Sequence, residues 1–217
     1  MYTGKVKVAG PADVRELGEL IVSKIAVGPM DNNSYLLRCR RTGAQVLIDA
    51  AAEPDTLLTL IGGDGLTAVV TTHAHRDHWA GALREVVDNT GAATYAHPAD
   101  AGAIDVPTTH LVSDGDCIPV GAAELRVIHL VGHTPGSIAL LYDDPDGPPH
   151  LFTGDSLFPG GVGRTTTPKA FQSLFDDVSE KVFARLPDET WVYPGHGDDT
   201  SLGHERPSLP SWAARGW

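Results

Sequence analysis

The chain has 217 residues, of which 41% are hydrophobic and 20% are charged, and its formal net charge at pH 7 is −12. This length and composition predict one globular domain with a substantial core and exclude an intrinsically disordered chain. The acidic balance argues against nucleic acid or an anionic membrane surface as a partner, because binding to phosphates needs a basic footprint. No apolar run approaches the ~18 residues of a membrane span and no secretory signal follows Met1, so we expect a cytoplasmic protein.

The first half of the chain is expected to begin with strands. Residues of high β propensity dominate three runs, Leu20–Val27, 34–38 and Gln45–Ile48. Turn residues at 41–44 favour a hairpin between the last two runs. Pro54 then begins a short helix that Gly62 and Gly63 end.

Helices and strands are expected to alternate further along. After a buried strand at 66–72, helical spacing predicts a helix at 78–89 with Trp79, Leu83 and Val86 on its apolar face. A later helix begins at Pro168. Further strands are expected at Ala93–Ala96, 125–130, 138–143, 150–153 and 190–193. Because polar clusters repeatedly follow strand ends, the pattern predicts an α/β layered domain with its site at the mouths of loops.

Cysteine, tryptophan and the scattered histidines add little to a functional assignment. Cys39 and Cys117 cannot form a disulfide framework and are expected to be small core thiols. Trp212 and Trp217, in a C-terminal tail at 201–217, are expected to dock against the domain. The histidines outside any ligand pattern are expected at ordinary loop or strand positions: His97, His110, His129, His150 and His204.

Four potential metal ligands stand together within six residues: His73, His75, Asp77 and His78. Directly after a strand, His73 and His75 are two residues apart and project to the same side. Asp77 and His78 follow where the chain turns toward a helix, which can aim them at a second point. Such a cluster is expected to gather around a cation, and imidazole with carboxylate favours zinc, with iron and manganese also compatible.

Three later residues have the same character, because each follows a predicted strand and is flanked by glycine or proline. They are His133, Asp155 and His196. Tight turns of this kind aim a side chain and hold it. Each residue alone is more typical of a turn, but the three together with the first cluster indicate a metal centre. Ligating imidazoles commonly donate their second N–H to an acceptor, for which Asp49, Thr72, Thr134 and Ser156 are the candidates.

These residues resemble the metallo-β-lactamase superfamily over most of the chain. The resemblance implies an αβ/βα four-layer sandwich in a single domain, residues 1–217, with a metal-binding core at about 20–200. The implied ligand sets are His73, His75 and His133 for one ion, Asp77, His78 and His196 for the other, and Asp155 as a bridge. All seven positions carry the expected residue type, so two divalent ions, with zinc favoured, are the expected cofactors.

Within the superfamily, the segments at 132–137, 154–158 and 163–165 resemble glyoxalase II and its short, single-domain relatives. This implies a thioesterase that cleaves a hydroxyacyl thioester of a small thiol by a metal-bridging hydroxide. Asp77 is then the catalytic residue, because it ligates the second ion and orients the hydroxide. Arg164 is expected to bind a substrate carboxylate, with a surface salt bridge as the alternative. A small-molecule thioester is the expected partner, in a monomer or a homodimer.

Other activities stay open on the same residues. A related branch, the persulfide dioxygenases, uses one iron, and the implied ligands here are His73, His133 and Asp155. A lactonase is less favoured, because no tyrosine follows Asp155 closely. A non-catalytic binding protein is a third possibility, against which the intact set of ligands argues.

Overall fold

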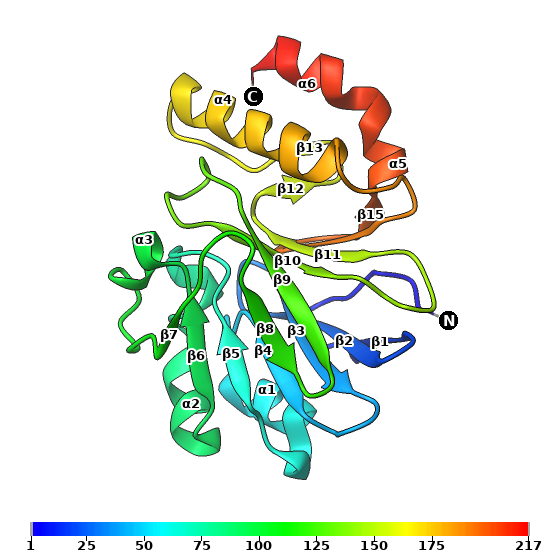
Figure 1. The fold of residues 1–217 in the computed structure, drawn as a ribbon. Coiled ribbons are helices and arrows are strands. Elements are labelled where there is room, and N and C mark those ends of the chain that lie inside the picture. Colours follow the sequence, from blue (N-terminus) through cyan, green and yellow to red (C-terminus); the bar gives the residue numbers. More distant parts are fainter. Residues whose placement is uncertain (1, 217) are drawn as a thin grey trace.

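Two β-sheets form the centre of the computed structural model, which describes residues 2–216 (Figure 1). The seven-stranded sheet takes its strands in chain order: β1 (Asp13–Glu16), β2 (Leu20–Val27), β3 (Asn32–Cys39), β4 (Gln45–Ile48), β5 (Ala68–Val70), β6 (Ala93–Ala96) and β7 (His110–Leu111). The six-stranded sheet has the order β15 (Thr200–Ser201), β14 (Trp191–Pro194), β11 (His150–Gly154), β10 (Ile138–Tyr142), β9 (Ala123–His129) and β8 (Cys117–Val120). A separate hairpin pairs β12 (Leu157–Phe158) with β13 (Gly161–Val162).

Helices cover the outer face of each sheet. They are α1 (Pro54–Ile61), α2 (Leu83–Thr90), α3 (Pro98–Ala101), α4 (Pro168–Asp177), α5 (Leu202–Glu205) and α6 (Leu209–Arg215). In Figure 1, α1 and α2 lie against the seven-stranded sheet, and α4 and α6 lie on the far side of the other sheet. Short 3₁₀ turns occupy Gly62–Asp64, Arg76–His78 and Arg206–Ser208, and a π-helix at Val178–Phe183 continues α4.

Strand alternation explains why the molecule has four layers. In β4, Val46 and Ile48 point into the core between the sheets, whereas Leu47 points outward and packs with Leu57 of α1. A third apolar cluster joins the six-stranded sheet to α4 and α6. Each fully buried side chain of this size contributes about 1.5–3 kcal/mol by leaving water. Helix, sheet, sheet and helix therefore stack in the predicted αβ/βα sandwich, as a single domain.

The predicted hairpin and the helix at Pro54–Ile61 are present. The expected strand at 66–72 is shorter, because the N–H of Thr72 donates to the carboxylate of Asp49 and leaves the ladder. The predicted helix at 78–89 is wrong at its start, since α2 begins at Leu83. Residues 76–78 form a 3₁₀ turn, and the N–H of Gly81 bonds to the carbonyl of Ala51 instead of continuing a helix.

The predictions for the cysteines and for the C-terminal tryptophans have different outcomes. Cys39 is fully buried as expected, but the prediction for Cys117 is wrong. It lies on the edge strand β8, whose alternation turns Cys117 toward solvent. Trp212 is buried and packs edge-on against Phe183, with ring centroids 6.2 Å apart, whereas Trp217 lies outside the described residues. Over residues 2–216, no helix combines the length and the apolar character that a membrane crossing needs.

Candidate metal centre

Asp49 orients two of the candidate ligands from the end of β4. One carboxylate oxygen accepts the N–H of Thr72 at 2.8 Å. The other accepts the Thr72 hydroxyl at 2.8 Å and Nδ1 of His78 at 2.9 Å. Because the Thr72 hydroxyl donates to Asp49, it accepts from Nδ1 of His73 at 3.0 Å. One buried carboxylate therefore sets the direction of both imidazoles, as the sequence predicts for Asp49 and Thr72.

Backbone carbonyls orient two more imidazoles. Nδ1 of His133 donates to the carbonyl of Arg164 at 2.7 Å, and Nδ1 of His196 donates to the carbonyl of Met30 at 2.9 Å. With Nδ1 engaged as a donor in all four rings, Nε2 is left to face the interior of the cluster. Neither carbonyl stands out in the sequence, because any residue carries one.

The first group of donors consists of His73, His75, His133 and Asp155. Nε2 of His73 and Nε2 of His133 are 3.3 Å apart. The Asp155 Oδ2 atom lies 4.0 Å from the first of these nitrogens and 3.5 Å from the second. The His75 ring stands edge-on to both imidazoles, with centroid distances of 4.8 and 4.5 Å.

The second group consists of Asp77, His78 and His196. Nε2 of His78 and Nε2 of His196 are 3.1 Å apart, and Oδ2 of Asp77 lies 3.4 Å from each. Oδ1 of Asp155 lies 3.4 Å from His78, and its Oδ2 lies 3.6 Å from His196. The Asp155 carboxylate thus faces both groups, which is the arrangement expected of a bridge.

Glycines allow this close approach. A Cβ at residue 195 would overlap Oδ1 of Asp155 and come within 2.8 Å of His78, and a Cβ at residue 163 would overlap the Asp155 carbonyl. The Gly154 backbone also has φ of +48°, in the left-handed region that glycine tolerates best. The glycines beside Asp155 and His196 therefore serve packing of the donor cluster.

The donor set fits divalent cations. Two Nε2 lone pairs 3.1 Å apart repel unless a cation or a proton lies between them. Tetrahedral ligands at the usual Zn–N distances of about 2.0–2.1 Å stand ~3.3 Å from one another, close to the spacing of both imidazole pairs. Oδ1 of Asp155 is buried and accepts no hydrogen bond, so it too has a free donor pair. The chain thus carries a His/Asp site for divalent metal.

The charges within the cluster also favour cations. Burial and the neighbouring imidazoles lower the pKa of His73 well below its ordinary value. Burial alone would lower the pKa of His78, but the carboxylates of Asp49 and Asp155 raise it to about 10. A hydrogen bond from His196 holds the pKa of Asp77 below its usual range. The carboxylates thus favour a positive charge at His78, and because only a neutral imidazole binds metal, an ion bound there would replace that proton.

Two positioning residues escaped the sequence reasoning. Asp100 of α3 is buried, and its carboxylate accepts the N–H of Ala74 at 2.8 Å, the Thr134 hydroxyl at 2.5 Å and the N–H of Gly136 at 2.8 Å. It therefore joins the loop that carries His73 to the loop that carries His133. Asn32 donates to Asp77 at 2.8 Å. An isolated acidic or amide residue has no spacing that would have revealed either role.

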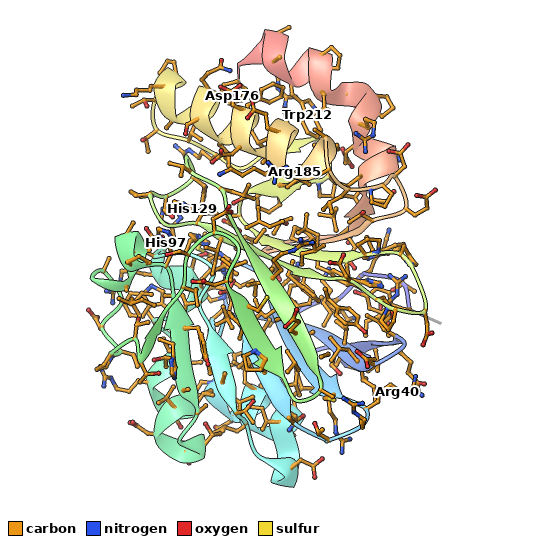
Figure 2. The ribbon with its side chains drawn as sticks, viewed as in Figure 1. Arg40, His97, His129, Asp176, Arg185 and Trp212 are labelled. Atoms are coloured by element: carbon orange, nitrogen blue, oxygen red, sulfur yellow. The ribbon has the colours of Figure 1, made fainter. Side chains whose placement is uncertain are left out.

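Other candidates lie away from the ligands. The Thr134 hydroxyl serves Asp100 and not an imidazole, and Ser156 Oγ is buried without a hydrogen-bond partner. The Arg164 side chain is exposed, so its substrate role stays a prediction. The five histidines outside the ligand pattern lie outside both groups. Figure 2 shows two of them, His97 and His129, side by side, and their rings stack at 3.9 Å.

Fold and site together define a class of protein. The model of the metallo-beta-lactamase superfamily matches residues 27–196, which is most of the chain and includes all seven clustered donors. The chain therefore belongs to the metallo-beta-lactamase superfamily and is a metallo-hydrolase of that superfamily.

Three individual proteins show which members of the superfamily this chain is similar to. The hydroxyacylglutathione hydrolase of Polaromonas sp. is 37% identical over 180 residues, which cover 82% of this chain and 66% of that protein. ETHE1 from Myxococcus xanthus has a similar structure, with a TM-score of 0.76, 31% identity, and coverage of 89% of this chain and 84% of that one. TTHA1623, solved in a di-iron-bound form, has a TM-score of 0.71, 34% identity, and coverage of 87% and 98%.

Proposed function

We propose that this protein is a binuclear thioesterase of the glyoxalase II type, which hydrolyses a hydroxyacyl thioester of a small thiol. The observation that carries the proposal is the pair of complete donor groups sharing Asp155, since hydrolysis at a bridged centre uses both. The 37% identity to a hydroxyacylglutathione hydrolase over 82% of the chain supports this substrate class.

The residues of the chain divide the work. One ion would be held by His73, His75 and His133. The other would be held by Asp77, His78 and His196, and Asp155 would contact both ions. Bound divalent ions would polarise the thioester carbonyl and lower the pKa of a coordinated water toward neutrality. Asn32 would keep the Asp77 carboxylate in one direction. Water adds to the carbonyl carbon, the C–S bond breaks, and a carboxylic acid and a thiol leave.

Thioesters suit such a site because the leaving group is a good one. A thiol has a pKa near 8.5, so its sulfur departs without strong general-acid help. The exposed Arg164 follows the hairpin of β12 and β13 and stands beside the cluster through its carbonyl contact with His133. Its guanidinium would bind the carboxylate of the acyl or thiol part. Zinc is the favoured ion, with iron or manganese as alternatives.

A second candidate is a mononuclear iron persulfide dioxygenase. It needs only His73, His133 and Asp155, whose donor atoms lie within 4.0 Å of one another. The 31% identity to ETHE1 over 89% of the chain favours keeping this alternative.

One set of measurements separates the two. Metal content by mass spectrometry, hydrolysis of S-lactoylglutathione and oxygen uptake on glutathione persulfide are compared for wild type, Asp155→Ala and Asp77→Ala. We expect two ions per chain and hydrolysis that falls by at least about a hundredfold in both variants. The dioxygenase would instead bind one iron and consume oxygen, and Asp77→Ala would spare that activity.

His204→Ala provides the control, because His204 is exposed and belongs to neither donor group. It should keep wild-type metal content and hydrolysis. Wild-type protein that holds metal but hydrolyses no thioester and consumes no oxygen would overturn both assignments and favour a binding protein.

A further inference from the structure

A fully buried ion pair lies just outside the metal centre. Lys24 of β2 and Asp199, in the loop between β14 and β15, have side chains that are 0% and 1% exposed, and their charged atoms are 2.6 Å apart. The ammonium also donates to the carbonyls of Gly4 and Gly197, both at 2.7 Å. All three of its hydrogens are therefore engaged, and neither residue of the pair belongs to a donor group.

Asp199 is equally well satisfied. Its second oxygen accepts the Tyr2 hydroxyl at 2.6 Å and the Trp191 indole N–H at 2.8 Å. Burial of two charges costs several kcal/mol per ion before their attraction repays it, and an apolar pair of similar volume is often as stable. The pair is therefore not explained by its contribution to stability alone, and the groups that the ammonium binds suggest another role.

The ammonium holds the backbone that carries His196. The carbonyl of Gly197 accepts from both Lys24 and the Asn33 side chain, the latter at 2.9 Å. Asn33 also binds the carbonyls of Pro194 and Gly195. Segment 194–199 extends from a strand of the six-stranded sheet, whereas Lys24 and Asn33 belong to the seven-stranded sheet. These bonds therefore fasten the His196 loop across the interface between the sheets.

The fastened loop carries a donor of the second group, His196, and none of the first. Asp77 and His78 follow β5 of the seven-stranded sheet, and His196 is the one member of their group that comes from the other sheet. The 3.1 Å spacing between His78 and His196 needs that loop placed to within a few tenths of an ångström. In the first group, the loops that carry His73 and His133 are joined across the sheets by Asp100 instead.

We propose that the Lys24–Asp199 ion pair is a positioning device for the second metal ion, acting by holding the His196 loop against β2. The inference rests on the proposed two-ion centre. It assigns to Lys24 a role in the affinity of one ion and none in the affinity of the other. Loss of a residue that orients a metal ligand commonly lowers affinity about 10–100-fold.

The test is a stepwise titration of metal-free protein with zinc against a chromogenic chelator, for wild type, Lys24→Met and Lys24→Met/Asp199→Asn. The double variant leaves no unpaired buried charge and keeps an oxygen for Tyr2 and Trp191. We expect one of the two affinities to fall about 10–100-fold in both variants while the other stays at its wild-type value. A His196→Ala background identifies the affected ion, because Lys24→Met should have no further effect on the ion that remains there.

Lys5→Met is the matched control. Lys5 pairs with Asp198, the residue next to Asp199, but both side chains are mostly exposed and the distance is 3.3 Å. It should leave both affinities unchanged. Equal losses of both ions, no loss, or failure of both Lys24 variants to fold would overturn the proposal, since the pair would then serve the fold alone. Wild-type protein that binds a single ion would instead refute the two-ion centre itself.

Discussion

The orientation of each candidate ligand imidazole depends on the acceptor to which its Nδ1 atom donates. His73 and His78 both trace back to Asp49, one through the Thr72 hydroxyl and one directly. The carboxylate accepts three hydrogen bonds on two oxygens and donates none. An amide at this position cannot do the same, because one of its two atoms is a donor.

Asp49→Asn is therefore expected to weaken metal binding by about 10–100-fold while the chain still folds. The amide nitrogen would face a donor, either Nδ1 of His78 or the Thr72 N–H, and turn one imidazole away. Competition with a chelator measures the affinity. Asp105→Asn serves as the control. The Asp105 carboxylate lies 3.5 Å from the exposed side chain of Arg76, which belongs to the loop that carries His73 to His78. An unchanged affinity in Asp49→Asn would contradict the role.

At the scale of elements, the site forms where loops from two sheets meet, and α3 joins two of them. Asp100 of this four-residue helix accepts from the loop after β5 and from the loop after β9. Gly136 suits this contact, since a Cβ there would come within 2.7 Å of the Asp100 carboxyl carbon. The helix thus acts as a brace between the loops of His73 and His133, candidate ligands that lie 60 residues apart in the chain.

Asp100→Asn should loosen both loops, because its nitrogen would oppose the N–H of Gly136 or of Ala74. Hydrogen exchange of metal-free protein, followed by mass spectrometry, should show faster exchange in peptides covering 73–78 and 132–137. Asp114→Asn is the control, because within residues 2–216 Asp114 accepts one bond only, from the N–H of His129 at 2.8 Å, and an amide oxygen can accept it equally well. It should leave both peptides unchanged. Equal protection in Asp100→Asn and wild type would rule out the brace.

At the scale of the whole molecule, the buried polar groups away from the site link stability to pH. His150 is 1% exposed and lies between the sheets, where Nδ1 and the Tyr193 hydroxyl share a hydrogen bond of 2.9 Å. Its Nε2 atom lies 4.0 Å from Oδ2 of Asp144, too far for a hydrogen bond. Burial, helped by Arg15, lowers the pKa of His150 from 6.5 to about 4. Between those values the unfolded chain binds the proton and the folded chain does not.

The stabilisation from neutral His150 is therefore complete above pH 6.5 and is lost as the pH falls toward 4, by up to about 3 kcal/mol. Urea unfolding of metal-free protein at pH 7.5, 6 and 5 measures this loss. In His150→Gln the slope over that window should be shallower, and the ligand histidines titrate equally in both proteins. Parallel pH dependences would contradict the assignment.

Much of the fold could be predicted from sequence because it rests on local patterns. The strands at Leu20–Val27 and Gln45–Ile48 and the helix at Pro54–Ile61 appear with the expected bounds. The start of α2 could not be predicted from sequence, because the hydrogen bond between Gly81 and Ala51, which are distant in the chain, overrides the helical spacing that includes Trp79. The edge position of Cys117 likewise depends on which strands flank β8.

Sequence alone determined the seven candidate donors, because they follow strands at short spacings with glycine neighbours, and the resemblance of these residues to the superfamily. Only the tertiary structure decided how they are held. The carbonyl of Met30 that orients His196, the carboxylate of Asp100 and the Lys24–Asp199 pair all act between segments distant in the chain. Their roles arise from the packing of one sheet on the other, which brings each acceptor to its donor and leaves no mark in local sequence.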